Sequence, residues 1–194
     1  MQGLRESCLG SHCFGASAAV VDTIGHGLHN DAASTVHALC SQPALGVMLS
    51  RFAAAPVVCM SKAILKPASK GSKVPAHADD QYFYTSPASG VTLWFALEDA
   101  TEANGCIEVL PASHLAYKPG QRFACGGDAG KARWAPPPAV DEPWRVDFPA
   151  KSDALAWQAL PVRAGAMIAM DRRLMHRSDA NKSGHSRRAL TLHV

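Results

Sequence analysis

Residues 91–97, VTLWFAL, restrict the fold more than any other segment, because their side chains alternate as in a β-strand. The odd positions hold only valine, leucine or phenylalanine, and the even positions hold Thr92, Trp94 and Ala96. Successive side chains of a strand point to opposite faces, so the pattern predicts a strand with one wholly apolar face. Asn104-Gly105 follows and predicts a hairpin turn, because both residue types tolerate a positive φ.

Two short helices are predicted before this strand. Asn30 or Asp31 is the expected N-cap of a helix that runs to Cys40. Pro43 is well placed at the start of a second helix, over residues 43–52, because the first turn of a helix tolerates proline. The chain therefore begins its readable part with helices.

Most of the remaining pattern is strand-like. We expect strands at 57–66, 162–171 and 187–194. Residues 115–160 are expected to form a long irregular segment, which is a lid, a binding loop or a disordered stretch. Helices followed by many short strands predict a mainly β (α+β) fold. The expected architecture is an antiparallel sandwich or jelly roll with flanking N-terminal helices.

Size and composition argue against several classes of protein. With 194 residues, 47% of them apolar, the chain is long enough for one domain with a substantial core. A net charge of +3 is too small to indicate a nucleic-acid-binding protein, and no apolar run reaches the ~18 residues of a membrane span. None of the 6 cysteines forms a C-x-x-C pair, so we expect no zinc knuckle and a reducing, intracellular, most simply cytoplasmic location.

His77-Ala78-Asp79 is the first candidate site. Residues i and i+2 of a strand project from the same face, so His77 and Asp79 are expected to point at one common atom. An imidazole next to a carboxylate, with no thiolate nearby, suits a divalent first-row metal better than calcium. The motif alone is short enough to arise by chance.

His176 offers a third donor atom. It follows the predicted strand 162–171 and opens a polar loop, so the fold must bring it to His77 and Asp79. Two histidines and one carboxylate on one side of a metal leave the opposite side open, as in non-haem Fe(II) oxygenases. Taken alone, His176 could equally be a surface histidine.

Arg187 begins the last predicted strand, on the same face as Ala189, Thr191 and His193. An inward guanidinium among small and polar side chains suits a bidentate grip on a carboxylate. 2-Oxoglutarate has such a carboxylate at its end remote from the metal. Arg188 would point the opposite way, as an outer salt-bridge partner. An unrelated metal-binding jelly roll, such as a cupin isomerase, stays open but leaves Arg187 without a role.

These motifs, in this order, resemble the phytanoyl-CoA dioxygenase (PhyH) family of Fe(II)- and 2-oxoglutarate-dependent oxygenases. The resemblance extends over residues 27–194 and includes AILKP, the H-x-D motif, VTLWFALEDATEANGCIEVLPASH, the H-x-S motif and the final arginine. It implies a double-stranded β-helix, the fold of cupins and jelly rolls, in a dioxygenase domain at 27–194. Residues 1–26 match poorly and form a separate N-terminal segment.

The resemblance also implies roles for individual residues. These are iron binding by His77, Asp79 and His176, a grip on the distal carboxylate of 2-oxoglutarate by Arg187 and Ser178, and a pocket wall at Trp94. The implied activity is hydroxylation of an unactivated C–H bond in a small or lipid-like organic substrate, with 2-oxoglutarate and O₂ consumed and ascorbate as a reductant. Trp94 could instead be a core residue, and Ser178 a turn residue.

Two departures from the family pattern leave alternatives open. Lys62 stands where relatives often have an apolar residue near the cosubstrate, so it either adds a second cationic contact or turns outward. The weak match of residues 1–26, together with the end of the chain at Val194, keeps a second function open. That function is a non-catalytic or weakened member that acts as a metal- and 2-oxoglutarate-binding scaffold or sensor.

Overall fold

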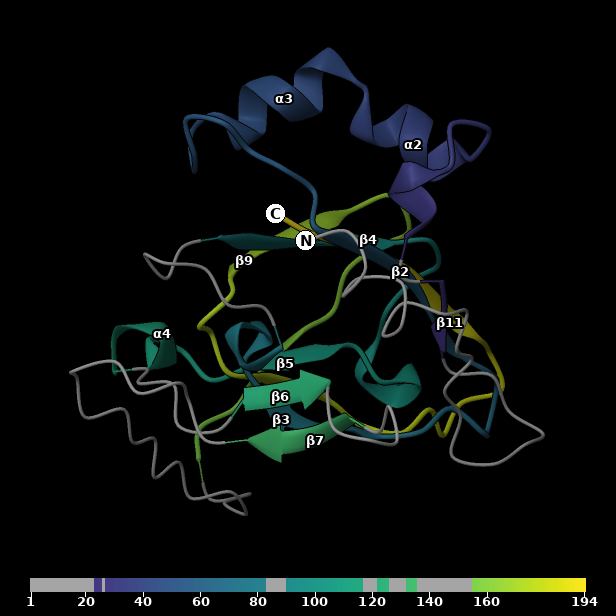
Figure 1. Cartoon of the computed structure of the whole chain (residues 1–194). Coiled ribbons are helices and arrows are strands. Elements are labelled where there is room, and N and C mark those ends of the chain that lie inside the picture. The colour runs from purple at the N-terminus through teal and green to yellow at the C-terminus, as the bar shows by residue number, and fades with distance from the viewer. Residues whose placement is uncertain (1–22, 26, 83–89, 117–121, 126–131, 136–154) are drawn as a thin grey trace.

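The computed structural model describes residues 23–25, 27–82, 90–116, 122–125, 132–135 and 155–194 (Figure 1). Two antiparallel sheets dominate this part of the chain. The major sheet has the order β1 (Thr23–Ile24), β2 (Met60–Lys66), β11 (Arg187–His193), β4 (Val91–Ala96) and β9 (Met167–Asp171). The minor sheet has the order β3 (Val74–His77), β10 (His176–Ser178), β5 (Ile107–Val109) and β8 (Gln158–Leu160). The predicted mainly β fold is confirmed.

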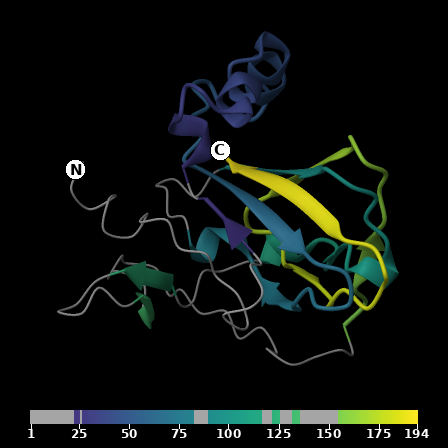
Figure 2. The same ribbon diagram turned by 90° about the vertical axis from the view of Figure 1, so that its right-hand side faces the viewer.

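Helices cover the outer face of the major sheet, while the minor sheet lies across its other face (Figures 1 and 2). The covering elements are the 3-10 helix η1 (Leu28–Asn30), α2 (Thr35–Cys40) and α3 (Pro43–Leu49). The remaining elements are η2 (Asp79–Gln81), η3 (Glu102–Asn104), α4 (Ser113–Ala116) and the paired strands β6 (Arg122–Cys125) and β7 (Ala132–Ala135). No helix in the described ranges is long and apolar enough to cross a membrane.

The alternating pattern of β4 is explained by burial on both faces. Val91 and Leu93 pack with Leu45 and Leu49 of α3, together with two leucines of β11. Trp94 and its even-numbered neighbour Ala96 lie in a second core against β5. Because β4 is enclosed by helices on one side and by the minor sheet on the other, it is a central strand. Its even face therefore looks into the space between the two sheets.

The structure corrects the predicted hairpin at Asn104-Gly105. Gly105 does adopt a left-handed conformation, with φ of 80°. It ends η3, however, and the strands on either side belong to different sheets, β4 to the major and β5 to the minor. The dipeptide thus makes a crossover between sheets, a choice that local turn propensity does not determine.

Two further expectations are corrected in part. The N-cap of α2 is Ser34, whose side chain accepts a hydrogen bond from the His37 amide. Asn30 and Asp31, the expected N-caps, instead form the last residue and the C-cap of η1. The segment expected to be irregular contains α4, β6, β7 and β8. The rest of that segment, residues 117–121, 126–131 and 136–154, lies outside the described residues.

Gly105 provides a test of this crossover. A Cβ at Gly105 would lie 2.3 Å from the Asp179 carbonyl oxygen, and the residue would be held at a positive φ. We expect Gly105→Ala to lower the free energy of unfolding by about 2 kcal/mol or more. The matched control is Gly46→Ala in α3, where nothing lies within 4 Å of the added Cβ; it should raise stability by about 0.5–1 kcal/mol. Urea denaturation of both variants checks the pair, and a Gly105→Ala protein as stable as the wild type would contradict it.

Candidate metal centre

Three side chains converge at the edge of the minor sheet. His77 ends β3 and is the direct cross-strand partner of His176, the first residue of β10. Their rings lie 4.3 Å apart between centroids. Asp79 Oδ1 lies 3.6 Å from His77 Nε2 and 3.8 Å from His176 Nε2. One donor atom from each of the three residues lies within 4.8 Å of the others.

The route by which Asp79 reaches this point differs from the expectation. β3 ends at His77, and Asp79 is the first residue of η2. The two side chains are therefore not successive members of one strand face. The turn after Ala78 instead swings the carboxylate toward both imidazoles. Similarly, His176 begins a strand rather than a loop, and its register with β3 places it opposite His77.

Backbone carbonyls fix the orientation of both imidazoles. His77 Nδ1 lies 2.8 Å from the Pro75 oxygen, and His176 Nδ1 lies 3.0 Å from the Leu174 oxygen. A carbonyl oxygen can only accept a hydrogen bond, so each Nδ1 holds the proton. The other ring nitrogen, Nε2, faces Asp79 in both residues and is the atom that can bind a metal. A metal-ligating histidine commonly has this arrangement, with the second nitrogen bonded to a carbonyl.

A buried polar network holds Asp79 from behind. Thr92 Oγ1 donates to Asp79 Oδ2 at 2.6 Å and lies 3.2 Å from His193 Nδ1. His193 Nδ1 is itself 3.7 Å from Asp79 Oδ2. Asp79 therefore has one oxygen held by Thr92 while the other faces the two histidines. Such outer contacts orient a ligating carboxylate.

The electrostatics favour one ionised carboxylate among neutral imidazoles. Burial alone would raise the pKa of Asp79, but the neighbouring His176 and His193 hold that pKa well below its ordinary value. Burial, followed by the neighbouring His77, lowers the pKa of His176 to about 4. Burial likewise lowers the pKa of His193 to about 3. At neutral pH His176 is thus a neutral imidazole beside an ionised carboxylate, and with His77 they make a donor set that fits a divalent first-row metal.

The three residues open onto a pocket of about 170 Å³ between the two sheets. Trp94, Ser178 and Arg187, which the family resemblance assigns to the cosubstrate, also line it. Arg187 is 1% exposed, and its Nε and Nη1 have no hydrogen-bond partner among the described residues. Its guanidinium carbon lies 5.4 Å from the centre of the Trp94 ring. Burial lowers the pKa of Arg187 to about 10, so it remains a cation at neutral pH.

Three residues of the pocket wall were not assigned from the sequence: Thr92 and His193 were given no role, and Lys62 was left with two alternatives. Thr92 shares a face of β4 with Trp94, and His193 shares a face of β11 with Arg187. These shared faces could have indicated from the sequence that both residues line the pocket. The alternation of faces could not show that the side chains of Thr92 and His193 lie next to Asp79. Lys62 also lines the pocket, so of the two alternatives for this residue the structure favours the inward one.

Comparison with known proteins agrees with the motif resemblance. The family model described as phytanoyl-CoA dioxygenase (PhyH) matches residues 17–189. The chain belongs to the phytanoyl-CoA dioxygenase family. Among its relatives is the phytanoyl-CoA dioxygenase of Arabidopsis thaliana, 38% identical over 141 residues, which are 72% of this chain and 44% of the relative. Phytanoyl-CoA dioxygenase domain-containing protein 1 of Mus musculus is 30% identical over 175 residues, 90% of this chain and 57% of the relative. The chain thus spans about half the length of these two family members.

Solved structures show the same fold. The non-heme alpha ketoglutarate dependent carbocyclase SnoK superimposes with a TM-score of 0.67 at 21% identity, over 99% of this chain and 72% of SnoK. EctD from S. alaskensis, solved with 2-oxoglutarate and 5-hydroxyectoine, gives a TM-score of 0.65 at 18% identity, over 89% of this chain and 55% of EctD. The epimerase SnoN, solved with Fe3+ and alpha ketoglutarate, gives a TM-score of 0.65 at 22% identity, over 94% of this chain and 66% of SnoN. The fold is therefore the cupin-like double-stranded β-helix of non-haem iron oxygenases.

Proposed function

We propose that this chain is the catalytic domain of an Fe(II)- and 2-oxoglutarate-dependent dioxygenase that hydroxylates an unactivated C–H bond. The observation that supports this most directly is the convergence of His77, Asp79 and His176, with their donor atoms within 4.8 Å, on the wall of one pocket. Two imidazoles and a carboxylate are the donor set of non-haem Fe(II) oxygenases. Family membership and the fold of the solved neighbours support the same class of chemistry.

In this proposal His77, Asp79 and His176 hold the iron. When bound with 2-oxoglutarate and O₂, the iron supplies the oxidising power for attack on the C–H bond. The backbone carbonyls of Pro75 and Leu174 keep the Nε2 atoms of the two histidines pointed at the site. Thr92 keeps Asp79 from rotating, by donating to Oδ2, the oxygen that does not face His77 and His176.

The proposed grip on 2-oxoglutarate is at Arg187. Its buried Nε and Nη1 lack partners among the described residues, so a carboxylate bound there would supply both hydrogen bonds. Trp94 lies beside the guanidinium, and the buried Ser178 lines the same pocket. We assign all three to the cosubstrate, with Ser178 offering a hydroxyl donor and Trp94 an apolar wall.

Apolar side chains form much of the remaining pocket wall: Ile64, Val74, Ile107 and Met170. They would exclude water and accept a small or lipid-like organic substrate. The overall reaction converts substrate, 2-oxoglutarate and O₂ into alcohol, succinate and CO₂, with one oxygen atom in the alcohol and the other in succinate. Ascorbate would keep the iron reduced.

The test is an anaerobic titration of metal-free protein with Fe(II) and then 2-oxoglutarate, followed by O₂. A visible charge-transfer band on addition of 2-oxoglutarate, and succinate release with a panel of apolar substrates after O₂, are the expected results. No band from folded protein would overturn the proposal. A band without succinate from any substrate would favour the scaffold or sensor function instead.

Thr92→Val tests the support of the metal site. The change removes the hydroxyl that donates to Asp79 Oδ2 but keeps the branched shape of a strand residue. We expect the dissociation constant for Fe(II) to rise by about 10–100-fold, as losses of outer contacts to metal ligands do. Competition with a chromogenic chelator measures it. Thr191→Val, on β11 in the same pocket but with its hydroxyl bonded to the Lys62 backbone oxygen, is the control.

A further inference from the structure

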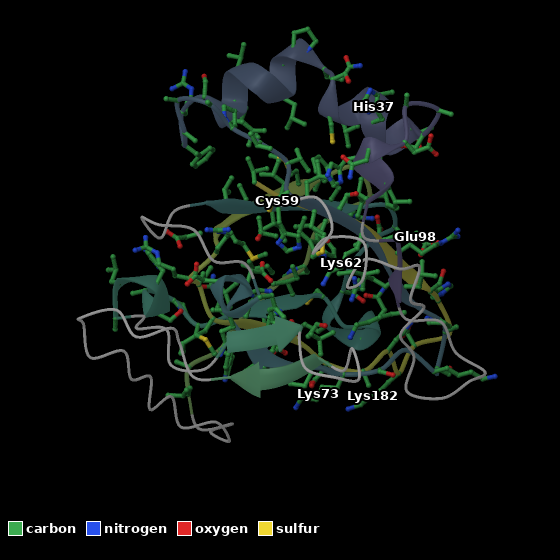
Figure 3. The ribbon with its side chains drawn as sticks, viewed as in Figure 1. His37, Cys59, Lys62, Lys73, Glu98 and Lys182 are labelled. Atoms are coloured by element: carbon green, nitrogen blue, oxygen red, sulfur yellow. The ribbon has the colours of Figure 1, made fainter. Side chains whose placement is uncertain are left out.

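Lys62 extends into the site pocket from β2. In the register of the major sheet it pairs with Thr191 of β11, and it lines the same pocket as the three proposed metal ligands. Figure 3 shows Lys62 below β2, toward the minor sheet, while Lys73 and Lys182 lie at the far edge of the molecule. The Lys62 side chain is thus directed into the enclosed space between the sheets.

The ammonium group of Lys62 has no hydrogen bond or ion pair within the described part of the chain. The nearby Lys66 provides a contrast, because its buried ammonium donates to the carbonyl oxygens of Ser72 and Asp179. The carboxylate of Asp79 acts on Lys62 through its charge, but the contacts of its oxygens are with Thr92 and the histidines. Lys62 is half-buried, and a cation partly withdrawn from water without a bonded partner is costly. Its presence in the pocket therefore indicates an anion that comes from outside the chain.

Lys62 and Arg187 enter the pocket from different levels of the major sheet. Arg187 pairs with Lys66 on β2. Lys62 precedes Lys66 by four positions on that strand, so the backbones of Lys62 and Lys66 are about 13 Å apart. Lys62 is at the end near the proposed metal ligands: burial lowers its pKa, while the negative charge of Asp79 works to raise it. The pocket thus has one cation near the metal site and a second one remote from it.

This arrangement matches an anion with two charged ends. On the basis of the function proposed above, we propose that Lys62 binds the carboxylate next to the keto group of 2-oxoglutarate, while Arg187 binds the carboxylate at the other end. Lys62 is then a cosubstrate-binding residue, and the pair of cations selects a dianionic 2-oxo acid. A bound carboxylate would also separate the ammonium from the positive metal and so reduce their repulsion.

The experiment compares the binding of two ligands to the wild type, two pocket variants and one control variant. Calorimetric titrations under anaerobic conditions, with Fe(II) present, would use 2-oxoglutarate and 2-oxopentanoate, which has the same chain length but lacks the distal carboxylate. Lys62→Met keeps an unbranched side chain without the charge. We expect it to weaken both ligands by about ten- to hundredfold, the loss typical of a charge-assisted hydrogen bond. Arg187→Ala should weaken 2-oxoglutarate alone.

Lys182→Met is the matched control, because Lys182 is exposed and far from the pocket; it should leave both affinities unchanged. Thermal melting gives a second readout. Without ligand, Lys62→Met should melt at the wild-type temperature or above, since it removes an unpartnered charge, yet gain less from added 2-oxoglutarate. Wild-type affinity of Lys62→Met for both ligands would overturn the role of Lys62. A wild type that fails to bind 2-oxoglutarate would instead overturn the proposed function.

Discussion

Asp79→Ala is expected to abolish turnover and to weaken Fe(II) binding by more than about 100-fold. Losses of 10–100-fold are typical when an outer contact to a metal ligand is removed, and the ligand itself contributes more. Asp79 is the one anionic donor beside His77 and His176, and its Oδ1 lies within 3.8 Å of both Nε2 atoms. Without it, two imidazoles on adjacent strands would hold the metal alone. Metal content after anaerobic loading and gel filtration, together with succinate release, measures both effects.

Asp79→Asn separates charge from shape in the same experiment. The amide keeps the volume and can still accept from Thr92, but it is a weaker ligand than a carboxylate, so we expect nearly the same loss. Asp99→Ala is the control, because Asp99 is an exposed carboxylate paired with Arg163 outside the pocket. Full metal loading of Asp79→Ala would contradict the assignment of the metal site. Loss of metal with retained binding of a partner protein would favour a separate scaffold role.

The strands that build the pocket were predictable because both of their faces are buried by different partners. In β4 and β11 the odd–even alternation corresponds directly to two cores, so Trp94 and Arg187 could be placed on the inner face from spacing alone. The motif resemblance added the order of the site residues and the family, which the family-model match confirms. The roles of His77, Asp79 and His176 in metal binding stay predictions that the variants above test.

The remaining features depend on tertiary structure that local patterns do not encode. Asp79 lies outside its expected strand, and only the turn into η2 brings its carboxylate to the histidines. Gly105 has the positive φ that its residue type predicts, yet the packing of two sheets decides that it serves a crossover. The contact of Thr92 with Asp79 and His193 joins three distant segments. Strand periodicity can place such residues on a face but cannot pair them.

Arg187→Ala is expected to raise the dissociation constant for 2-oxoglutarate by about 100- to 1000-fold. Truncation of one partner of a buried, hydrogen-bonded charge pair costs 2–5 kcal/mol, which corresponds to this range. The guanidinium is 1% exposed and has two nitrogens without partners among the described residues, so a carboxylate bound there would be fully desolvated. Iron binding should be unchanged, because Arg187 is remote from the three proposed ligands along β11. Calorimetry with 2-oxoglutarate and chelator competition for Fe(II) measure the two quantities separately.

The next residue in the chain supplies the control for that change. Arg188 points to the opposite face of β11, is exposed, and forms an ion pair with Glu98 at 2.6 Å. Arg188→Ala removes the same charge from the same strand, so non-specific effects of net charge or strand stability would appear in both variants. We expect Arg188→Ala to keep the wild-type affinity for 2-oxoglutarate. Equal losses in the two variants would mean that Arg187 acts through the strand, whereas a loss confined to Arg187→Ala would mean that its guanidinium binds the distal carboxylate.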